Sequence, residues 1–148
     1  LLAKNVKGKF EDLDGLIEID LEKNNNNKAI FSVMIKSIST NYTQYRDLLL
    51  SKIFFHEEKY PIAFIDTKKF SYKYDEEFDL LVELNIKGKA QNIPLKLKVM
   101  RLADDLVQIK ANLSFSRNSF YLGTGNWSST AILKDKVIIN ANLFLFRN

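Results

Sequence analysis

The residues best suited to chemistry in this chain are His56 and the two glutamates that follow it. A histidine beside a carboxylate can move protons or help to hold a metal ion. His56 is the only histidine and the chain has no cysteine, so a histidine-based zinc set has no second member. Glu57 and Glu58 are adjacent, and in an extended segment adjacent side chains point in different directions. We therefore interpret His56 as a solvated loop residue.

Two other patterns resemble enzyme motifs only in part. Ser114, Ser116 and Ser119 lack the G-x-S-x-G context of a nucleophile elbow and have no spare histidine to act as their base. Residues 123–125 (GTG) resemble a phosphate-binding loop, but no lysine follows the second glycine and no helical pattern comes after it. The sequence therefore predicts a protein that is not an enzyme and that carries no cofactor or metal ion.

Three charged residues stand next to apolar clusters instead of in the polar alternation of the chain. A partly buried ion pair between Arg46 and Asp47 would pin a neighbouring helix, which is a structural role. Arg117 has two interpretations. It could meet the anionic head group of a ligand at the mouth of a barrel, or it could hold a loop in place.

The composition fits one globular domain. Of 148 residues, 46% are hydrophobic and 27% are charged, which is an ordinary balance, and no apolar run is long enough to cross a bilayer. The net charge is +4, but the basic residues are scattered. Lys68, Lys69 and Lys73 are followed at once by three acidic residues, so no nucleic acid is expected as a partner.

The dominant pattern is the alternation of apolar and polar residues with a period of two. In residues 78–86 every even position is apolar, and residues 93–99 and 107–115 alternate in the same way. Alternation of this kind predicts antiparallel strands with one buried and one solvated face. The strand-like segments are about 6–21, 28–38, 62–72, 77–87, 91–102, 105–116 and 135–147.

One stretch departs from the alternation. Residues 42–50 have apolar side chains three and four positions apart, which predicts a short helix, with residues 39–41 (STN) available as its N-cap. An aromatic turn at residues 53–55 (IFF) should pack this helix against one end of a barrel. The predicted fold is therefore a single all-β, antiparallel barrel domain over residues 1–148, with one short helix.

These segments together resemble the YceI-like family of polyisoprenoid-binding proteins. Residues 46–55 (RDLLLSKIFF) and 60–64 (YPIAF) are similar to the R-D-x-x-L-x-S-x-x-F-F and Y-P-x-I-x-F segments of that family, although each is one residue shorter here. Shorter similarities follow in the family's order at residues 8–10 (GKF), 15–17 (GLI), 39–40 (ST), 84–88 (LNIKG), 116–120 (SRNSF) and 137–139 (VII).

The resemblance implies a lipocalin-like barrel of about eight strands in a periplasmic or secreted protein. Its interior would take a long isoprenoid, a quinone or a related lipid, and a barrel of this size can hold one small ligand. The chain departs from the family at Asn118, where an acidic residue is common, and at residues 89–92, which replace the usual turn. The family's first strand is missing or reduced to residues 1–3. We therefore expect either further N-terminal residues or a barrel that is open along one edge.

The leading hypothesis is a carrier that sequesters a polyisoprenoid, quinone or fatty-acid-like lipid inside the barrel. Arg117 and Tyr121 could contact its head group, and Phe120 and Trp127 could gate the mouth. For each lining residue the alternative is that it simply fills the core. The predicted lining residues are Phe31, Val33, Ile35, Phe64, Leu80, Val82, Leu84, Leu97, Val99, Ile109, Leu113 and Ile139.

The rival hypothesis is an interaction module with a filled core, whose exposed strand edge pairs with a partner strand. The segment 6–21 would border the open edge on one side, and residues 137–146 would border it on the other. The last segment is apolar on both faces near its end, because Phe144 and Phe146 point opposite to Leu143 and Leu145. This pattern predicts a homodimer through the strand edge, or a cover supplied by upstream residues.

Overall fold

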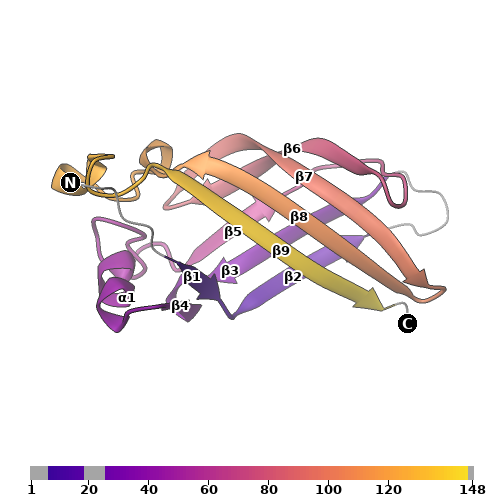
Figure 1. Ribbon diagram of the computed structural model, residues 1–148, viewed down its shortest axis with the longest axis horizontal. Helices are drawn as coiled ribbons and strands as arrows, with labels where there is room; N and C mark the ends of the chain where they lie inside the picture. Colours follow the sequence, from indigo (N-terminus) through magenta and orange to yellow (C-terminus); the bar gives the residue numbers. More distant parts are fainter. Residues whose placement is uncertain (1–6, 19–25, 147–148) are drawn as a thin grey trace.

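The computed structural model describes residues 7–18 and 26–146, and in them nine strands and one α-helix form a half-barrel (Figure 1). The helix is α1 (Thr43–Leu50), and short 3₁₀ turns lie at η1 (Ile35–Ser37), η2 (Arg117–Phe120) and η3 (Gly125–Ser128). The strands are β1 (Gly8–Phe10), β2 (Leu13–Glu18), β3 (Lys28–Met34), β4 (Ile38–Thr40), β5 (Ile62–Asp66), β6 (Glu77–Ile86), β7 (Lys89–Ala103), β8 (Leu106–Ser116) and β9 (Lys136–Phe146).

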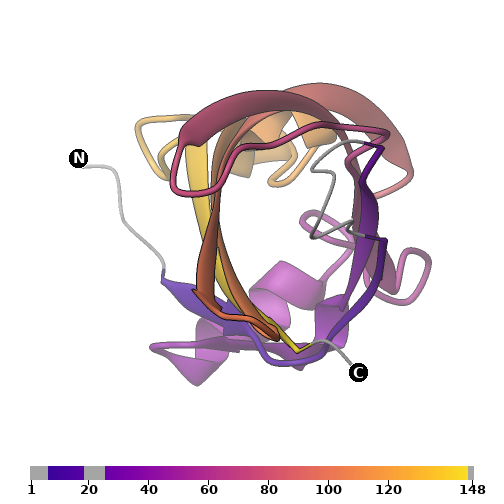
Figure 2. The same cartoon turned by 90° about the vertical axis from the view of Figure 1, so that its right-hand side faces the viewer.

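Seven of these strands form one antiparallel sheet in the order β2-β3-β5-β6-β7-β8-β9, and β1 pairs separately with β4. Figure 2 shows the strands of the large sheet curling around a common axis. The all-β antiparallel prediction is confirmed. The predicted first segment is divided, because the chain leaves the sheet at Glu11 and Asp12 between β1 and β2. The two edges of the sheet are β2 and β9, the segments expected to border the gap.

The centre of the sheet is held by paired apolar side chains on its concave face. Val82 lies opposite Ile93 across β6 and β7, and Val99 lies opposite Ile109 across β7 and β8. Val82 and Val99 are both 0% exposed. Each such side chain contributes about 1.5–3 kcal/mol when it is fully buried. Because the side chains of a strand alternate between faces, this register places Lys96 and Lys98 of β7 outside.

The predicted helix is confirmed, but its predicted N-cap is wrong. Tyr42 occupies the cap position and no side chain caps the helix, because residues 38–40 pair with β1 as β4. Arg46 holds the helix in place differently from the predicted ion pair. Its Nε donates to the carbonyl oxygen of Ile38 (3.1 Å) and its Nη2 donates to that of Lys36 (2.6 Å). Asp47 is exposed, and no ion pair joins it to Arg46 in the described part of the chain.

We expect Arg46→Met to lower the free energy of unfolding by about 1.5–3 kcal/mol, because two hydrogen bonds from a charged donor are lost. The neighbouring Asp47→Ala should change it by no more than about 0.5 kcal/mol. Urea unfolding of the two variants beside the parent measures both values. Equal losses in the two variants would restore the ion-pair interpretation.

Candidate ligand-binding site

The concave face of the sheet is mostly apolar, but its side chains are buried to different degrees. On β6, β7 and β8 the inward side chains near the middle are buried, as at Leu84, Leu97 and Leu113. Towards the two edges of the sheet the inward side chains are only half-buried. We call this half-buried set the apolar trough; its residues are Phe31 and Val33 on β3, Ala63 and Ile65 on β5, and Val137, Ile139, Ala141, Leu143 and Leu145 on β9.

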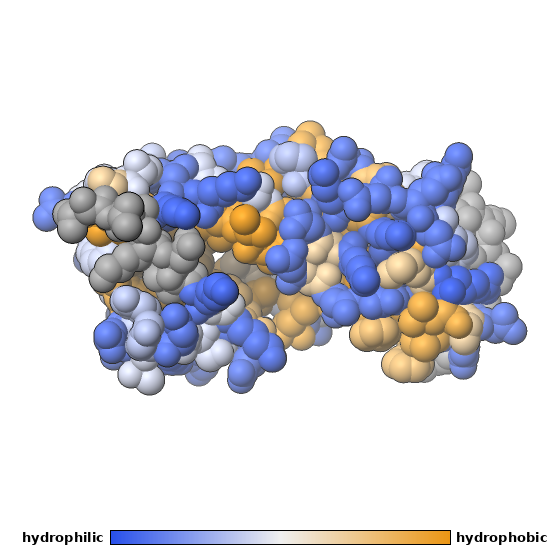
Figure 3. Space-filling view, in the orientation of Figure 1, coloured by the Kyte–Doolittle hydropathy of each residue, from blue (hydrophilic) through white to orange (hydrophobic). Residues whose placement is uncertain are grey.

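Two small residues, one of them in the trough, lie side by side on the inner face of the sheet. Ala111 on β8 is opposite Ala141 on β9 and opposite Leu97 on β7. Both alanines face inward and are half-buried. A methyl group fills little of the space that a leucine would fill at the same position, so this row of the inner face carries less side-chain volume than the rows beside it. Figure 3 shows the molecule hollowed between its two ends, with apolar side chains at the sides of the hollow.

The structure places the predicted lining residues in three groups. The first consists of buried side chains that pack the interior: Val82, Leu84, Leu97, Val99, Ile109 and Leu113. Ile35 is also buried, but it lies in η1 beyond the end of β3 and is not among the residues of this core, so its predicted place in the lining is wrong. The second consists of half-buried side chains on the inner face: Phe31, Val33, Leu80 and Ile139. Phe64 forms the third, and its predicted place is wrong. It is opposite Ser32 and Asn85, on the outer face, while its neighbours Ala63 and Ile65 pack against the core.

Phe31 has its place in the trough because of Gly15 on the neighbouring strand. The two residues are directly opposite each other across β2 and β3. A Cβ atom on Gly15 would lie 2.9 Å from Cδ1 of the Phe31 ring. The absence of a side chain therefore lets the ring approach β2 closely.

Arg117 ties down a loop and does not reach a ligand head group. Its side chain is enclosed, with 2% of the residue exposed. The guanidinium donates to four carbonyl oxygens of the segment that follows it. These are Leu122 (2.9 Å), Ser129 (3.3 Å), Leu133 (2.8 Å) and Lys134 (2.9 Å). Burial lowers the pKa of Arg117, and the carboxylate of Asp135 opposes that change. The head-group interpretation of Arg117 is therefore wrong, and its structural alternative holds.

The segment anchored by Arg117 closes one end of the barrel. Phe120 is 0% exposed and packs edge-on against Phe115 with ring centroids 5.2 Å apart. Trp127 packs in the same manner on Phe54, at 5.7 Å, so the predicted contact of the aromatic turn with the barrel end is confirmed. Figure 1 shows α1 and residues 117–134 at this same end. Phe120 and Trp127 are thus parts of a packed end wall, which corrects their predicted role as a gate.

Gly123 makes this end wall possible. It has φ +96°, and a Cβ atom there would lie 2.6 Å from Nη1 of Arg117. The N–H groups of Gly123 and Thr124 donate to the carbonyl oxygen of Ile53, at 2.8 and 3.0 Å. Tyr121 lies outside the wall, 57% exposed, with the Lys89 ammonium 3.9 Å from its ring centroid. It therefore faces solvent at the closed end, away from the trough.

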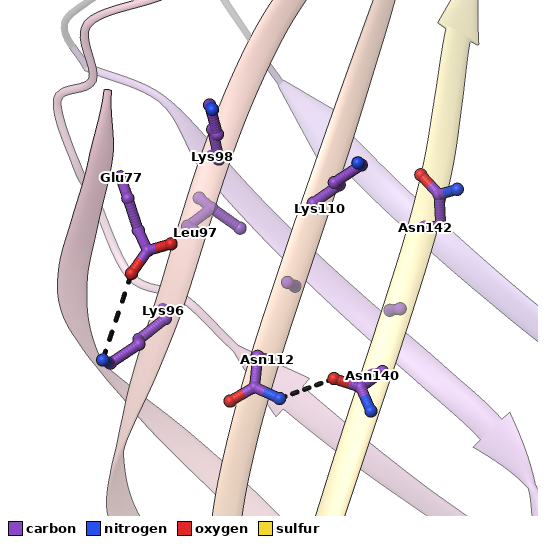
Figure 4. Close-up of a pocket in the computed structure, with 10 residues that line it drawn as sticks. Glu77, Lys96, Leu97, Lys98, Lys110, Asn112, Asn140 and Asn142 are labelled. Atoms are coloured by element: carbon purple, nitrogen blue, oxygen red, sulfur yellow. Dashed lines mark hydrogen bonds and ion pairs between the residues drawn. The ribbon is translucent and has the colours of Figure 1, made fainter. Parts of the chain in front are cut away.

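A cavity of about 550 Å³ lies on the wall formed by β6 to β9, mostly on its outer side. In Figure 4 its lysine and asparagine side chains stand in front of the strands, and Leu97 lies behind β7. Seven of its ten lining residues have charged or amide side chains, and the other three are apolar. Its residues are Glu77, Lys96, Leu97, Lys98, Lys110, Ala111, Asn112, Asn140, Ala141 and Asn142.

The enzyme-like residues do not come together. The ring of His56 packs edge-on against Tyr60, with centroids 5.7 Å apart. In residues 7–18 and 26–146 no group of three or more histidine, aspartate or glutamate side chains is placed to hold a metal ion. No helix among these residues is long and apolar enough to span a bilayer.

Residues 1–145 match the family model of the YceI-like domain. The chain belongs to this family. A curated relative from Photorhabdus laumondii, a UPF0312 protein, is 29% identical over 93 residues, which are 63% of this chain and 48% of that protein. The chain thus matches about half the length of this relative.

Solved structures of similar proteins share the fold. The YceI protein of Campylobacter jejuni superposes with a TM-score of 0.88 and 24% identity, over 100% of this chain and 88% of that one. BcnA of Burkholderia cenocepacia gives 0.85 and 24%, over 93% and 86%. A polyisoprenoid-binding domain from Saccharophagus degradans, implicated in plant cell wall breakdown, gives 0.73 and 17%, over 95% and 85%. At these identities the similarity shows the fold alone.

Several trough residues were not among the predicted lining residues. The alternation of residues 137–145 gave a signal for Val137, Leu143 and Leu145. Ala111 and Ala141 had a weaker one, two small residues in an otherwise bulky alternation. What the sequence lacked was the register that makes these alanines neighbours, since cross-strand pairing depends on the whole sheet.

We expect Arg117→Met to lower the free energy of unfolding by at least about 3 kcal/mol, because it leaves several enclosed carbonyl groups without a donor. Arg101→Met is the control. Because Arg101 is exposed, this substitution should lower the free energy of unfolding by less than about 1 kcal/mol. Thermal and urea unfolding give the comparison. A stable Arg117 variant would show that the end wall does not depend on this side chain.

Asp135 gives the end wall a dependence on pH. The Ser116 hydroxyl, the Asn118 N–H (3.1 Å) and the charge of Arg117 hold the pKa of Asp135 below its usual value, against desolvation. Because the folded pKa lies below the unfolded one, ionised Asp135 stabilises the fold above about pH 4, and this contribution is lost as the pH falls through the folded pKa.

Asp135→Asn should therefore destabilise the protein at pH 7 more than at pH 3. Urea unfolding of parent and variant at both pH values tests this, with Asp79→Asn, exposed on β6, as the control carboxylate. The same loss at both pH values would contradict the assignment.

Proposed function

We propose that this protein binds one long apolar molecule, a polyisoprenoid, quinone or fatty-acid-like lipid, in the apolar trough. The observation that carries the proposal is the incomplete burial of inward apolar side chains on β3, β5 and β9. Interior side chains of a filled barrel are packed to the density of a crystal. Here the residues of β9 alternate regularly between apolar inward and other outward side chains, but the inward side chains are only half-buried. They leave apolar surface for a ligand to cover.

The shape of the site favours a chain over a compact ligand. The five trough residues of β9 are spaced two apart from Val137 to Leu145, so the apolar strip runs the length of the strand. One end is closed by Phe120 and Arg117, so a ligand would extend from that wall towards the opposite end. Burial contributes about 0.8 kcal/mol per methylene, so a ten-carbon stretch would gain about 8 kcal/mol against the cost of association.

The relatives agree with a binding role of this kind. The Saccharophagus degradans domain is described as polyisoprenoid-binding, and the family match covers nearly the whole chain. We extend that role to this chain because its interior offers apolar contacts.

Replacing Ala141 by tryptophan tests the proposal. The indole would fill the space beside the small side chains of this row of the trough, so the affinity for a fluorescent fatty acid should fall at least about tenfold while the protein stays folded. Asn142→Trp is the matched control, because residue 142 is the next position on β9 and faces outward. Val82→Trp, in the packed part, should instead cost about 1–3 kcal/mol of stability. Unchanged binding in Ala141→Trp, or equal losses in Ala141→Trp and Asn142→Trp, would contradict the proposal.

A second candidate function is strand pairing through the edge of the sheet, with a partner or a second copy. The observation that favours it is the apolar character of the edge strand β9 on both faces, with Ile138 59% and Phe146 72% exposed. Unpaired edges of this kind recruit strands. Hydrogen exchange should then be fast in β9 of a monomer and slow in the paired form. Slow exchange along β9 in a monomer would contradict this candidate.

A further inference from the structure

An exposed apolar patch lies on the outer face of β7, β8 and β9, at the end of the barrel away from α1. Leu102, Phe144 and Phe146 are 50%, 51% and 72% exposed. Half-buried Met100 and Leu106 join them, since Phe146 is directly opposite Leu106 and Met100 shares its neighbour Gln108 with Phe144. We call these five residues the outer patch. Figure 3 shows apolar side chains gathered at this end, with hydrophilic ones beside them.

Two lysines border the outer patch on the side nearer the middle of the strands. Lys98 and Lys110 are directly opposite each other on β7 and β8, and like charges in this arrangement are destabilising. Glu77 is opposite Lys98, but its carboxylate approaches Lys96 instead, at 4.0 Å. In the described part of the chain neither Lys98 nor Lys110 makes an ion pair.

Two aspartates border the same patch on its other side. Asp104 and Asp105 form the exposed turn between β7 and β8. Arg101 donates weakly to the backbone carbonyl of Asp104 (3.5 Å), and its guanidinium lies over the Tyr74 ring. No ion pair holds either aspartate among residues 7–18 and 26–146. Along the β7–β8 hairpin the lysine pair is therefore followed by the outer patch, and the outer patch by the aspartate turn.

We propose that the outer patch is the interface between two copies of this chain, related by a two-fold axis that lies in the plane of the contact, perpendicular to the β7–β8 hairpin. Such an axis reverses the direction of the hairpin in the second copy. It therefore brings the lysine pair of each copy against the aspartate pair of the other, and it buries the exposed phenylalanines at the centre. Two lysines face two aspartates at each end of the contact, so the charges match.

The same charges disfavour an anionic membrane as the occupant of the patch. A bilayer that attracted Lys98 and Lys110 would repel the two carboxylates on the other side of the phenylalanines. The patch has five apolar residues on a convex wall, so the interface is small, and interfaces below about 1,200 Å² are characteristic of weak association. We therefore infer a dimer that forms and dissociates with protein concentration.

This interface does not rest on the proposed lipid function, because the outer patch and the trough lie on opposite faces of the sheet. It also differs from strand pairing at the edge, which would use the backbone of β9. Dimerisation through the outer patch would leave the trough open in both copies.

A charge exchange between two variants tests the two-fold arrangement. One variant carries Lys98→Glu with Lys110→Glu, and the other carries Asp104→Lys with Asp105→Lys. Each variant alone brings like charges together and should dimerise at least about tenfold more weakly than the parent. An equimolar mixture should form a heterodimer, because both contacts then join opposite charges. Sedimentation velocity measures all four samples, with circular dichroism to establish that each variant is folded.

A second comparison tests the apolar centre. Phe144→Ser with Phe146→Ser should weaken the parent dimer at least about tenfold, and Leu81→Ser, 60% exposed on the outer face of β6, should not. A parent protein that stays monomeric at millimolar concentration would overturn the proposal, and so would a mixture of folded charge variants that forms no heterodimer. If the parent is monomeric and sediments with anionic vesicles, and the variant without the two phenylalanines does not, the patch binds a membrane. That result would also overturn the proposal.

Discussion

The central constraint in this structure is that a sheet with one apolar face must cover that face. Curling lets the middle strands β6, β7 and β8 bury their inward side chains under those of the strands across the barrel. The strands near the two edges have less opposite them, so the same alternation that buries Val82 leaves Ile139 half-exposed. The trough is thus a direct consequence of a curled sheet with two edges, and a long apolar ligand would complete the core that the chain begins.

The closed end follows from a different interaction, the enclosure of one guanidinium. Arg117 supplies the donors that the carbonyl groups of residues 122–134 need, and enclosed carbonyls without donors are costly. This network holds a segment without regular strands at the end of the barrel, where Phe120 packs on Phe115 and Trp127 packs on Phe54. A wall at one end and a trough along the side give the site a direction, which suits an elongated ligand.

The period-two alternation was enough to predict the seven strands of the large sheet, because side-chain direction in a strand depends only on local position. The short helix was predictable for the same reason. The alternation did not predict where the strands end: β3 ends at Met34 and β5 at Asp66, short of the predicted 38 and 72. Phe64 was misplaced because the segment around it is apolar on both faces, so its direction depends on the pairing of β5 with β3. The role of Arg117 was undetermined for a related reason, since its four acceptors lie 5 to 17 residues further along the chain. Ala111 and Ala141 became a site only through the register of β8 and β9.

Native mass spectrometry of the protein purified without detergent tests the central claim most directly. If the trough is a lipid site, part of the protein should carry one non-covalent adduct with the mass of a long-chain apolar molecule. That adduct should be released by organic solvent and should be absent from Ala141→Trp but present in Asn142→Trp. A parent protein that carries no adduct, and that takes up none when incubated with polyisoprenoid, quinone and fatty acid, would contradict the account.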